Sequence, residues 1–104
     1  MENTALLLID LQNDYFESFE NAKWKLKNTE EAASNALKLL NKFREKNMKI
    51  IHVRHEFNME NPPFFAPNSQ GAKIHDSLTP KENETQVLKH DVNSFKNTNL
   101  KEIL

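Results

Sequence analysis

Two residues of opposite charge, Asp10 and Lys89, each stand at the end of a short apolar segment, where parallel β-sheets place their ligand sites. Asp10 closes the apolar run at residues 5–10, and Lys89 closes residues 84–89. An ammonium group beside a carboxylate favours the ionised carboxylate, which can then accept a proton. The pair is therefore a candidate for acid–base catalysis. The alternatives are a turn aspartate and a surface ion pair without a function.

These two residues must be positioned by strands and a helix. The apolar run at residues 5–10 predicts a strand buried on both faces. A helix is predicted at residues 28–46, where Asn28 and Glu31 have the spacing of a capping box. Residues 49–54 predict a second buried strand, which completes a βαβ unit with parallel strands. One apolar stripe of the helix is expected to face the sheet: Ala33, Ala36, Leu37, Leu40 and Phe43.

A long connection follows the second strand. Residues 58–84 have no strong periodicity and contain all four prolines and the single glycine, so they are predicted to be a loop. A loop of this length in a compact domain more often has a function than not. Residues 84–89 then predict a third, weaker strand, and residues 97–99 supply a cap for a short helix at 100–104.

Side chains near the predicted strand ends are candidates for a substrate pocket: Phe16, His55 and Phe64. Phe64 and its neighbour Phe65 either line that pocket or pin the loop to the core, and we favour the second interpretation. The four histidines are scattered rather than clustered, so no metal and no cofactor are predicted. Among them, His52 lies inside a predicted strand and is interpreted as a core histidine.

The composition describes one small domain. The chain has 104 residues, of which 38% are hydrophobic, so it has a marginal core or part of a larger one. With 14 basic and 15 acidic residues, it has no electrostatic signature of nucleic-acid or anionic-membrane binding. No segment resembles a membrane span or signal peptide, which makes a cytoplasmic location the default expectation. There is no cysteine, which excludes a thiol nucleophile within these residues.

Two established site patterns fit poorly. Phosphatases of the haloacid-dehalogenase type need two aspartates two positions apart after the first strand, whereas Asp10 and Asp14 are four apart. Receiver domains of response regulators need an acidic pair after the first strand and a phosphorylated aspartate at the end of the third. Ile9 and Lys89 occupy the positions where those acidic residues would be expected.

The sequence does resemble one family closely. Residues 5–16, with the core Leu-Leu-Ile-Asp-Leu-Gln-Asn-Asp-Tyr-Phe, resemble the opening motif of the isochorismatase-like cysteine hydrolases. Residues 50–55 resemble that family's second strand, residues 67–75 its connecting loop, and residues 87–100 the segment that carries its lysine. The resemblance extends over essentially the whole chain, and the first and last motifs are specific in combination.

The resemblance implies a three-layer α/β/α fold around a mainly parallel sheet, with an Asp–Lys–Cys triad. Asp10 matches the aspartate and Lys89 the lysine. In the family, the aspartate takes the thiol proton, the lysine favours the thiolate, and the cysteine attacks a carbonyl carbon to release ammonia or an amine. The family cysteine follows a fourth strand, which this chain does not reach. Residues 1–104 are therefore expected to be the N-terminal portion of a single, truncated domain.

The resemblance does not identify the substrate. Nicotinamidases of this superfamily place an aspartate and a histidine after the second strand as metal ligands, where this chain has His55 and Phe57. That difference argues against a nicotinamidase metal site. Members that cleave a vinyl ether use the aspartate as an acid and need no thiol, so the missing cysteine does not strictly exclude chemistry at Asp10.

Two functions are predicted as alternatives. The first is hydrolysis of C–N bonds in a small amide or ureido compound, with the cysteine outside this chain. The second is a non-catalytic truncated homologue that pairs its sheet edge or apolar terminus with another copy or a partner. A homo-oligomer is expected, with neither nucleic acid nor membrane as a partner.

Overall fold

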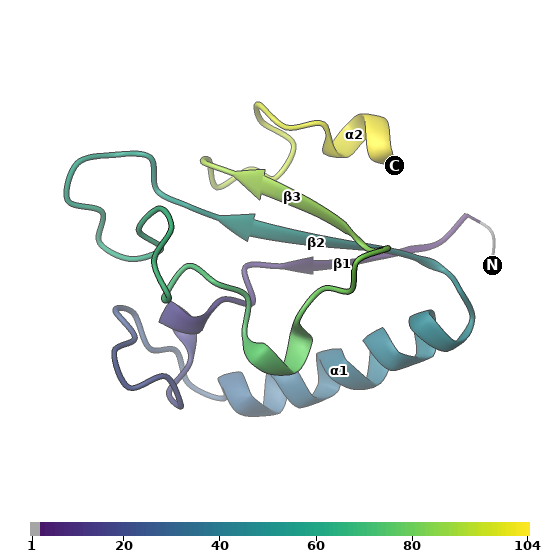
Figure 1. The fold of residues 1–104 in the computed structure, drawn as a ribbon, viewed down its shortest axis with the longest axis horizontal. Helices are drawn as coiled ribbons and strands as arrows, with labels where there is room; N and C mark the ends of the chain where they lie inside the picture. Colours follow the sequence, from purple (N-terminus) through teal and green to yellow (C-terminus); the bar gives the residue numbers. More distant parts are fainter. Residues whose placement is uncertain (1–2) are drawn as a thin grey trace.

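The structure, a computed structural model that describes residues 3–104, is built around a three-stranded parallel sheet (Figure 1). The strand order is β1-β2-β3, so β2 is central and the other two strands are edges. All three strands end on the same side of the molecule, where the segments after β1 and β2 gather. The elements are β1 Ala5–Ile9, η1 Asn13–Tyr15, α1 Thr29–Glu45, β2 Lys49–His55, η2 Asp76–Leu78, β3 Thr85–Lys89 and α2 Leu100–Ile103.

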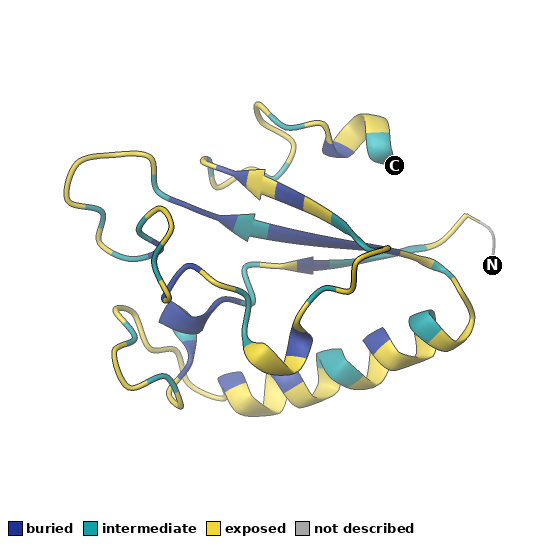
Figure 2. Ribbon diagram, viewed as in Figure 1, coloured by how far each residue is buried: buried dark blue, intermediate teal, exposed yellow. Residues whose placement is uncertain are grey.

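The helices α1 and α2 lie on opposite sides of the sheet, which confirms the three-layer arrangement (Figure 1). Side chains alternate between the two faces along each strand, so every strand contributes to both layers. Burial is concentrated along β2 (Figure 2), because it has a neighbour on each side. The core on the α1 side includes Leu8, Ile50, Ala33 and Leu40. The core on the α2 side includes Ile51, Val53, Val87 and Leu100.

The predicted apolar stripe of α1 faces the sheet. Ala33 and Leu40 are buried in the core, and Ala36, Leu37 and Phe43 pack against it. The predicted capping box is wrong, because the Asn28 side chain makes no capping hydrogen bond. Asn28 has a left-handed backbone, with φ of 61°, which differs from the extended conformation that a capping residue usually adopts.

The connection between β2 and β3 is irregular apart from η2, as its composition predicted. It is tied to the segment after β1 by an antiparallel bridge between Gln12 and Ile74. Phe65 is completely buried, so it anchors this connection to the core, whereas Phe64 is half-buried. Among the described residues, no helix combines the length and the apolar character needed to cross a membrane.

A partly buried polar network joins α1, β2 and the residue just before β3. The Glu84 carboxylate accepts hydrogen bonds from Arg44 Nε at 2.6 Å and from Arg44 Nη2 at 2.9 Å. The same carboxylate lies 2.8 Å from His52 Nε2, so His52 is a core histidine, as expected. The hydrogen bonds from Arg44, opposed by burial and helped by the Lys81 amide and His52, lower the pKa of Glu84 to about 2.

We expect Glu84→Gln to destabilise the protein at neutral pH by about 2–3 kcal/mol, because it leaves Arg44 without its ionic partner. A depressed folded-state pKa contributes stability above the unfolded value of 4.5, and that contribution is lost as the pH falls toward 2. The difference between the variant and the wild type should therefore shrink over that range. Urea unfolding at several pH values measures it, with the exposed Glu82→Gln as control. A pH-independent difference would contradict this explanation.

Candidate active site

Asp10 and Lys89 lie together at the carboxyl end of the sheet. Lys89 Nζ is 3.4 Å from Asp10 Oδ2, and the same ammonium donates a hydrogen bond to the Val92 carbonyl at 2.9 Å. The Lys89 side chain is only 2% exposed, whereas that of Asp10 is 26% exposed. A buried ammonium and a partly open carboxylate therefore form one ion pair across two strands that are not neighbours.

The backbone explains the position of Asp10. Its amide donates to the Val53 carbonyl at 3.0 Å, which extends the β1–β2 ladder by one hydrogen bond. Its φ is 60°, so the chain turns sharply at this residue. One carboxylate oxygen, Oδ2, faces Lys89, while Oδ1 is buried without a hydrogen-bond partner among the described residues. The ion pair thus leaves one oxygen of Asp10 available to accept a proton.

Tyr15 is a residue of this site that the sequence did not indicate. Burial raises the pKa of the Tyr15 phenol, and the negative charge of Asp10 raises it further. The phenol therefore stays neutral and lies within the electrostatic reach of Asp10. Its ring centroid is 5.5 Å from that of Phe64 and 4.7 Å from that of Phe65, so Tyr15 packs against the loop after β2.

The three predicted pocket residues do not gather in one place. His55 and Phe64 belong to a chain of aromatic contacts in which Phe57 lies 4.4 Å from His55 and 4.9 Å from Phe64, measured between ring centroids. Phe16 is 1% exposed, packs in the core under α1 and stacks on His75. The structure therefore places Phe16 with the core side chains rather than with the other two aromatic rings.

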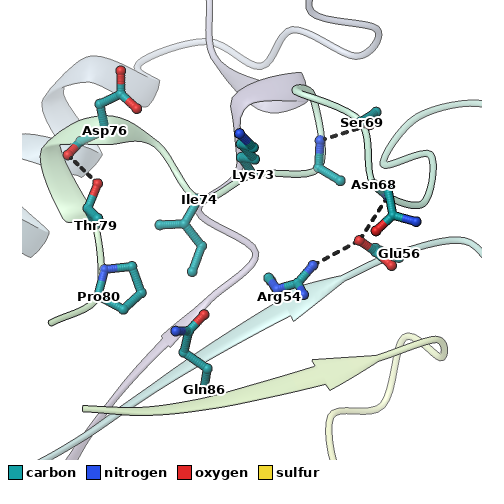
Figure 3. A pocket seen from close by; sticks show the side chains of 11 residues that line it. Arg54, Glu56, Asn68, Ser69, Lys73, Ile74, Asp76, Thr79, Pro80 and Gln86 are labelled. Carbon is teal, nitrogen blue, oxygen red and sulfur yellow. Dashed lines mark hydrogen bonds and ion pairs between the residues drawn. The ribbon is translucent and has the colours of Figure 1, made fainter. Parts of the chain in front are cut away.

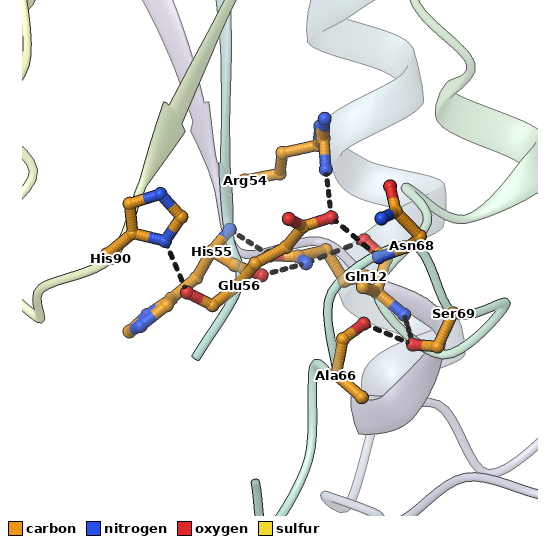
Figure 4. Close-up of polar contacts among 9 residues, drawn as sticks. Gln12, Arg54, His55, Glu56, Ala66, Asn68, Ser69 and His90 are labelled. Carbon is orange, nitrogen blue, oxygen red and sulfur yellow. Dashed lines mark hydrogen bonds and ion pairs between the residues drawn. The ribbon is translucent and has the colours of Figure 1, made fainter. Parts of the chain in front are cut away.

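Three consecutive residues of the opening motif, Gln12, Asn13 and Asp14, hold the loops around this site. Gln12 Nε2 donates to the carbonyls of His55 and Ala72, both at 2.7 Å, and its Oε1 accepts from the His55 amide (Figure 4). Asn13 Nδ2 donates to the Gln70 carbonyl. Sequence reasoning missed these roles, although the three residues lie in the motif that carries the family resemblance.

Asp14 holds two loops at once. Its Oδ1 accepts from the Lys23 amide at 3.1 Å, and its Oδ2 accepts from the Phe65 amide at 2.7 Å. Gly71 packs directly against this carboxylate, because a Cβ atom at position 71 would overlap it. The loop that carries the aromatic side chains is therefore fixed by a buried carboxylate and by the chain's single glycine.

A cavity of about 520 Å³ opens on the other face of the sheet (Figure 3). Arg54 and Gln86 line it, and they alternate along their strands with His55 and Lys89, so they point away from the ion pair. Arg54 is already bound to Glu56 at 2.9 Å. Among the described residues, no group of three or more potential metal ligands is found.

The sequence of the chain is similar to those of known proteins. The family model of the Isochorismatase domain matches residues 4–104. The chain is 50% identical over 97 residues to the uncharacterized isochorismatase family protein YddQ of Bacillus subtilis, which covers 93% of this chain and 52% of YddQ. It is 42% identical over 103 residues to the secreted isochorismatase effector Isc1 of Verticillium dahliae, covering 99% of this chain and 52% of Isc1.

A solved structure agrees closely with the fold. The crystal structure from Oleispira antarctica of a protein described as an isochorismatase hydrolase superposes with a TM-score of 0.94 at 54% identity. The superposition covers 99% of this chain and 55% of that structure. The chain thus spans about half the length of the curated relatives that it matches.

Proposed function

Because the chain belongs to the isochorismatase family, we propose that it supplies two members, Asp10 and Lys89, of an Asp–Lys–Cys triad. The proposed reaction is hydrolysis of a C–N bond in a small amide or ureido compound. The cysteine would come from outside residues 1–104, which contain none. The proposal includes a homo-oligomeric protein in the cytoplasm, without nucleic acid or membrane as a partner.

The observation that carries the proposal is that the two carboxylate oxygens of Asp10 have different surroundings. Oδ2 faces the buried Lys89 ammonium, and Oδ1 is buried without a partner. Oδ1 can accept the proton of a thiol, while the ammonium stabilises the resulting thiolate. The thiolate then attacks the substrate carbonyl carbon, and the C–N bond breaks as Asp10 returns the proton to the leaving nitrogen. Water hydrolyses the thioester and regenerates the thiol.

The arrangement of the sheet is compatible with a nucleophile that another segment of the protein supplies. β1 is an edge strand, and Asp10 stands at its carboxyl end. A further parallel strand on that edge would end beside Asp10, on the side opposite Lys89. A side chain following such a strand would reach the free oxygen of Asp10, which is what the proposed thiol requires.

Hydrolysis and thiol chemistry must be measured together, using the protein expressed from its complete reading frame. We expect ammonia release from a panel of small amides and ureas, and loss of that activity on alkylation with iodoacetamide. In Lys89→Met, the pH midpoint of alkylation should rise by about one unit, because the thiolate loses a nearby cation. The exposed Lys73→Met is the matched control. Hydrolysis that survives both complete alkylation and Lys89→Met would refute the triad.

The alternative is a non-catalytic chain that pairs with a second copy. The observation that favours it is the edge of β1, which has no neighbouring strand among the described residues. Ile9, near the end of β1, is also 42% exposed. An intact mass near 12.2 kDa for the protein from its native source, together with an obligate oligomer, would support this function. A stable monomer would count against it.

A further inference from the structure

His55 stands at the end of β2, the strand that lies between those leading to the two proposed triad residues. It is the last residue of β2, and the register pairs it with Lys89, so both side chains leave the same face of the sheet. Since β2 lies between β1 and β3, the Lys89 side chain must pass over the end of β2 to reach Asp10. The ion pair therefore spans the end of the strand that carries His55.

Hydrogen bonds fix the backbone of His55 on both sides, whereas its ring nitrogen Nε2 has no hydrogen-bond partner among the described residues. Gln12 accepts from the His55 amide and donates to its carbonyl, each at 2.7 Å (Figure 4). In the part of the chain that the structure describes, three buried side-chain atoms lack a hydrogen bond: His55 Nε2, Asp10 Oδ1 and His52 Nδ1. The first two belong to residues of this site.

An unpaired buried polar atom costs about 1–3 kcal/mol, so it requires an explanation. For Asp10 Oδ1, the proposed proton transfer from the thiol is that explanation. His55 Nε2 has no role in that mechanism, and the residue is only 4% exposed. His52, in the same strand, also has one unpaired ring nitrogen, Nδ1, but it lies away from this site and its Nε2 is paired with Glu84. A group that arrives with the substrate would satisfy the free nitrogen of His55.

The surroundings of His55 keep its ring neutral and in place. Burial lowers the pKa of His55 below its usual value, and the charge of Lys89 acts in the same direction. The charge of Asp10 and the backbone carbonyl of His90 oppose this lowering, while the charge of His90 adds to it. The ring also contacts Phe57 at 4.4 Å and Phe65 at 6.0 Å between centroids. A neutral imidazole offers a hydrogen bond without adding a charge beside the ion pair.

We propose that His55 is a substrate-binding residue of this site, whose Nε2 forms a hydrogen bond with the amide or ureido group being hydrolysed. This inference rests on the proposed function. It adds a third contact: Asp10 and Lys89 act on the thiol, and His55 orients the substrate group that the thiol attacks. The aromatic rings of Phe57 and Phe65 hold the imidazole in the required orientation.

The test separates substrate binding from chemistry in the complete protein. In His55→Phe, which keeps a planar ring but removes the hydrogen bond, we expect KM to rise about tenfold with kcat changed less than about threefold. In His55→Gln, which retains a polar group near the position of Nε2, KM should stay within about threefold of the wild type. His75→Phe is the control, because His75 stacks on Phe16 in the core.

Two results would overturn the inference while leaving the proposed function intact. One is an unchanged KM in His55→Phe. The other is an equal loss of activity in both His55 variants, which would indicate a structural role.

If the wild type hydrolyses none of the amides and ureas, the proposed function fails by itself. His55 is then judged by the ring NMR signals of the complete protein with benzamide and phenylurea at millimolar concentration. A selective shift of the His55 signal supports the contact, and no shift overturns it.

Discussion

Replacing Asp10 by asparagine is expected to lower kcat/KM for amide hydrolysis about a thousandfold, the usual contribution of a positioned proton acceptor. An amide group cannot accept the thiol proton and return it to the leaving nitrogen. Asparagine is the informative substitution because Asp10 has a φ of 60°, a conformation that asparagine tolerates well. Alanine would combine the loss of the carboxylate with backbone strain.

The loss of kcat/KM in Asp10→Asn should come from the chemical step and not from a loss of folded protein. Lys89 keeps its hydrogen bond to the Val92 carbonyl in Asp10→Asn, so the fold should persist. Circular dichroism and urea unfolding check this point. Asp76→Asn is the matched control, since Asp76 is exposed and its side chain makes no hydrogen bond among those described. Retention of more than about a tenth of the wild-type kcat/KM in Asp10→Asn would exclude Asp10 as the base.

Much of the fold that brings Asp10 to Lys89 follows from local patterns in the sequence. The apolar run before Asp10, the periodic stripe of α1 and the β-branched segment after it are each short-range signals. The rule that parallel strands end at the same edge then predicts that the residues closing β1 and β3 meet. The structure confirms this meeting, with an ion pair at 3.4 Å. No feature of the sequence alone indicated that Lys89 would be almost completely buried.

The parts of the site that could not be predicted depend on contacts between distant segments. Gln12 bonds to residues 43 and 60 positions away, and Asp14 to one 51 positions away. A single sequence gives no sign of such pairs, because a polar residue after a strand is equally compatible with an exposed turn. The placement of Phe16 was equally open, since large aromatic side chains suit a core as well as a pocket. Asn28 failed as a cap because its backbone is left-handed.

The largest expected loss of stability comes from Gly71→Ala, at about 3–5 kcal/mol, measured by urea unfolding. The reason is space rather than backbone conformation, because the φ of Gly71 is not in the left-handed region. The added methyl group would overlap the Asp14 carboxylate, which is buried and held by the amides of Lys23 and Phe65. Moving that carboxylate breaks two hydrogen bonds to a charged group, each worth about 1.5–3 kcal/mol.

A double-mutant cycle with Asp14→Ala identifies the cause of that loss. If the overlap with the carboxylate is responsible, adding Gly71→Ala to Asp14→Ala should cost less than about 1 kcal/mol, because the new methyl group then occupies vacated space. An equal cost in both backgrounds would mean that the carboxylate is not the obstacle. Coupling would also have a consequence for the site. Asp14 and Gly71 together place the loop with Phe64 and Phe65, so loosening this contact should raise KM in the complete protein before it abolishes folding.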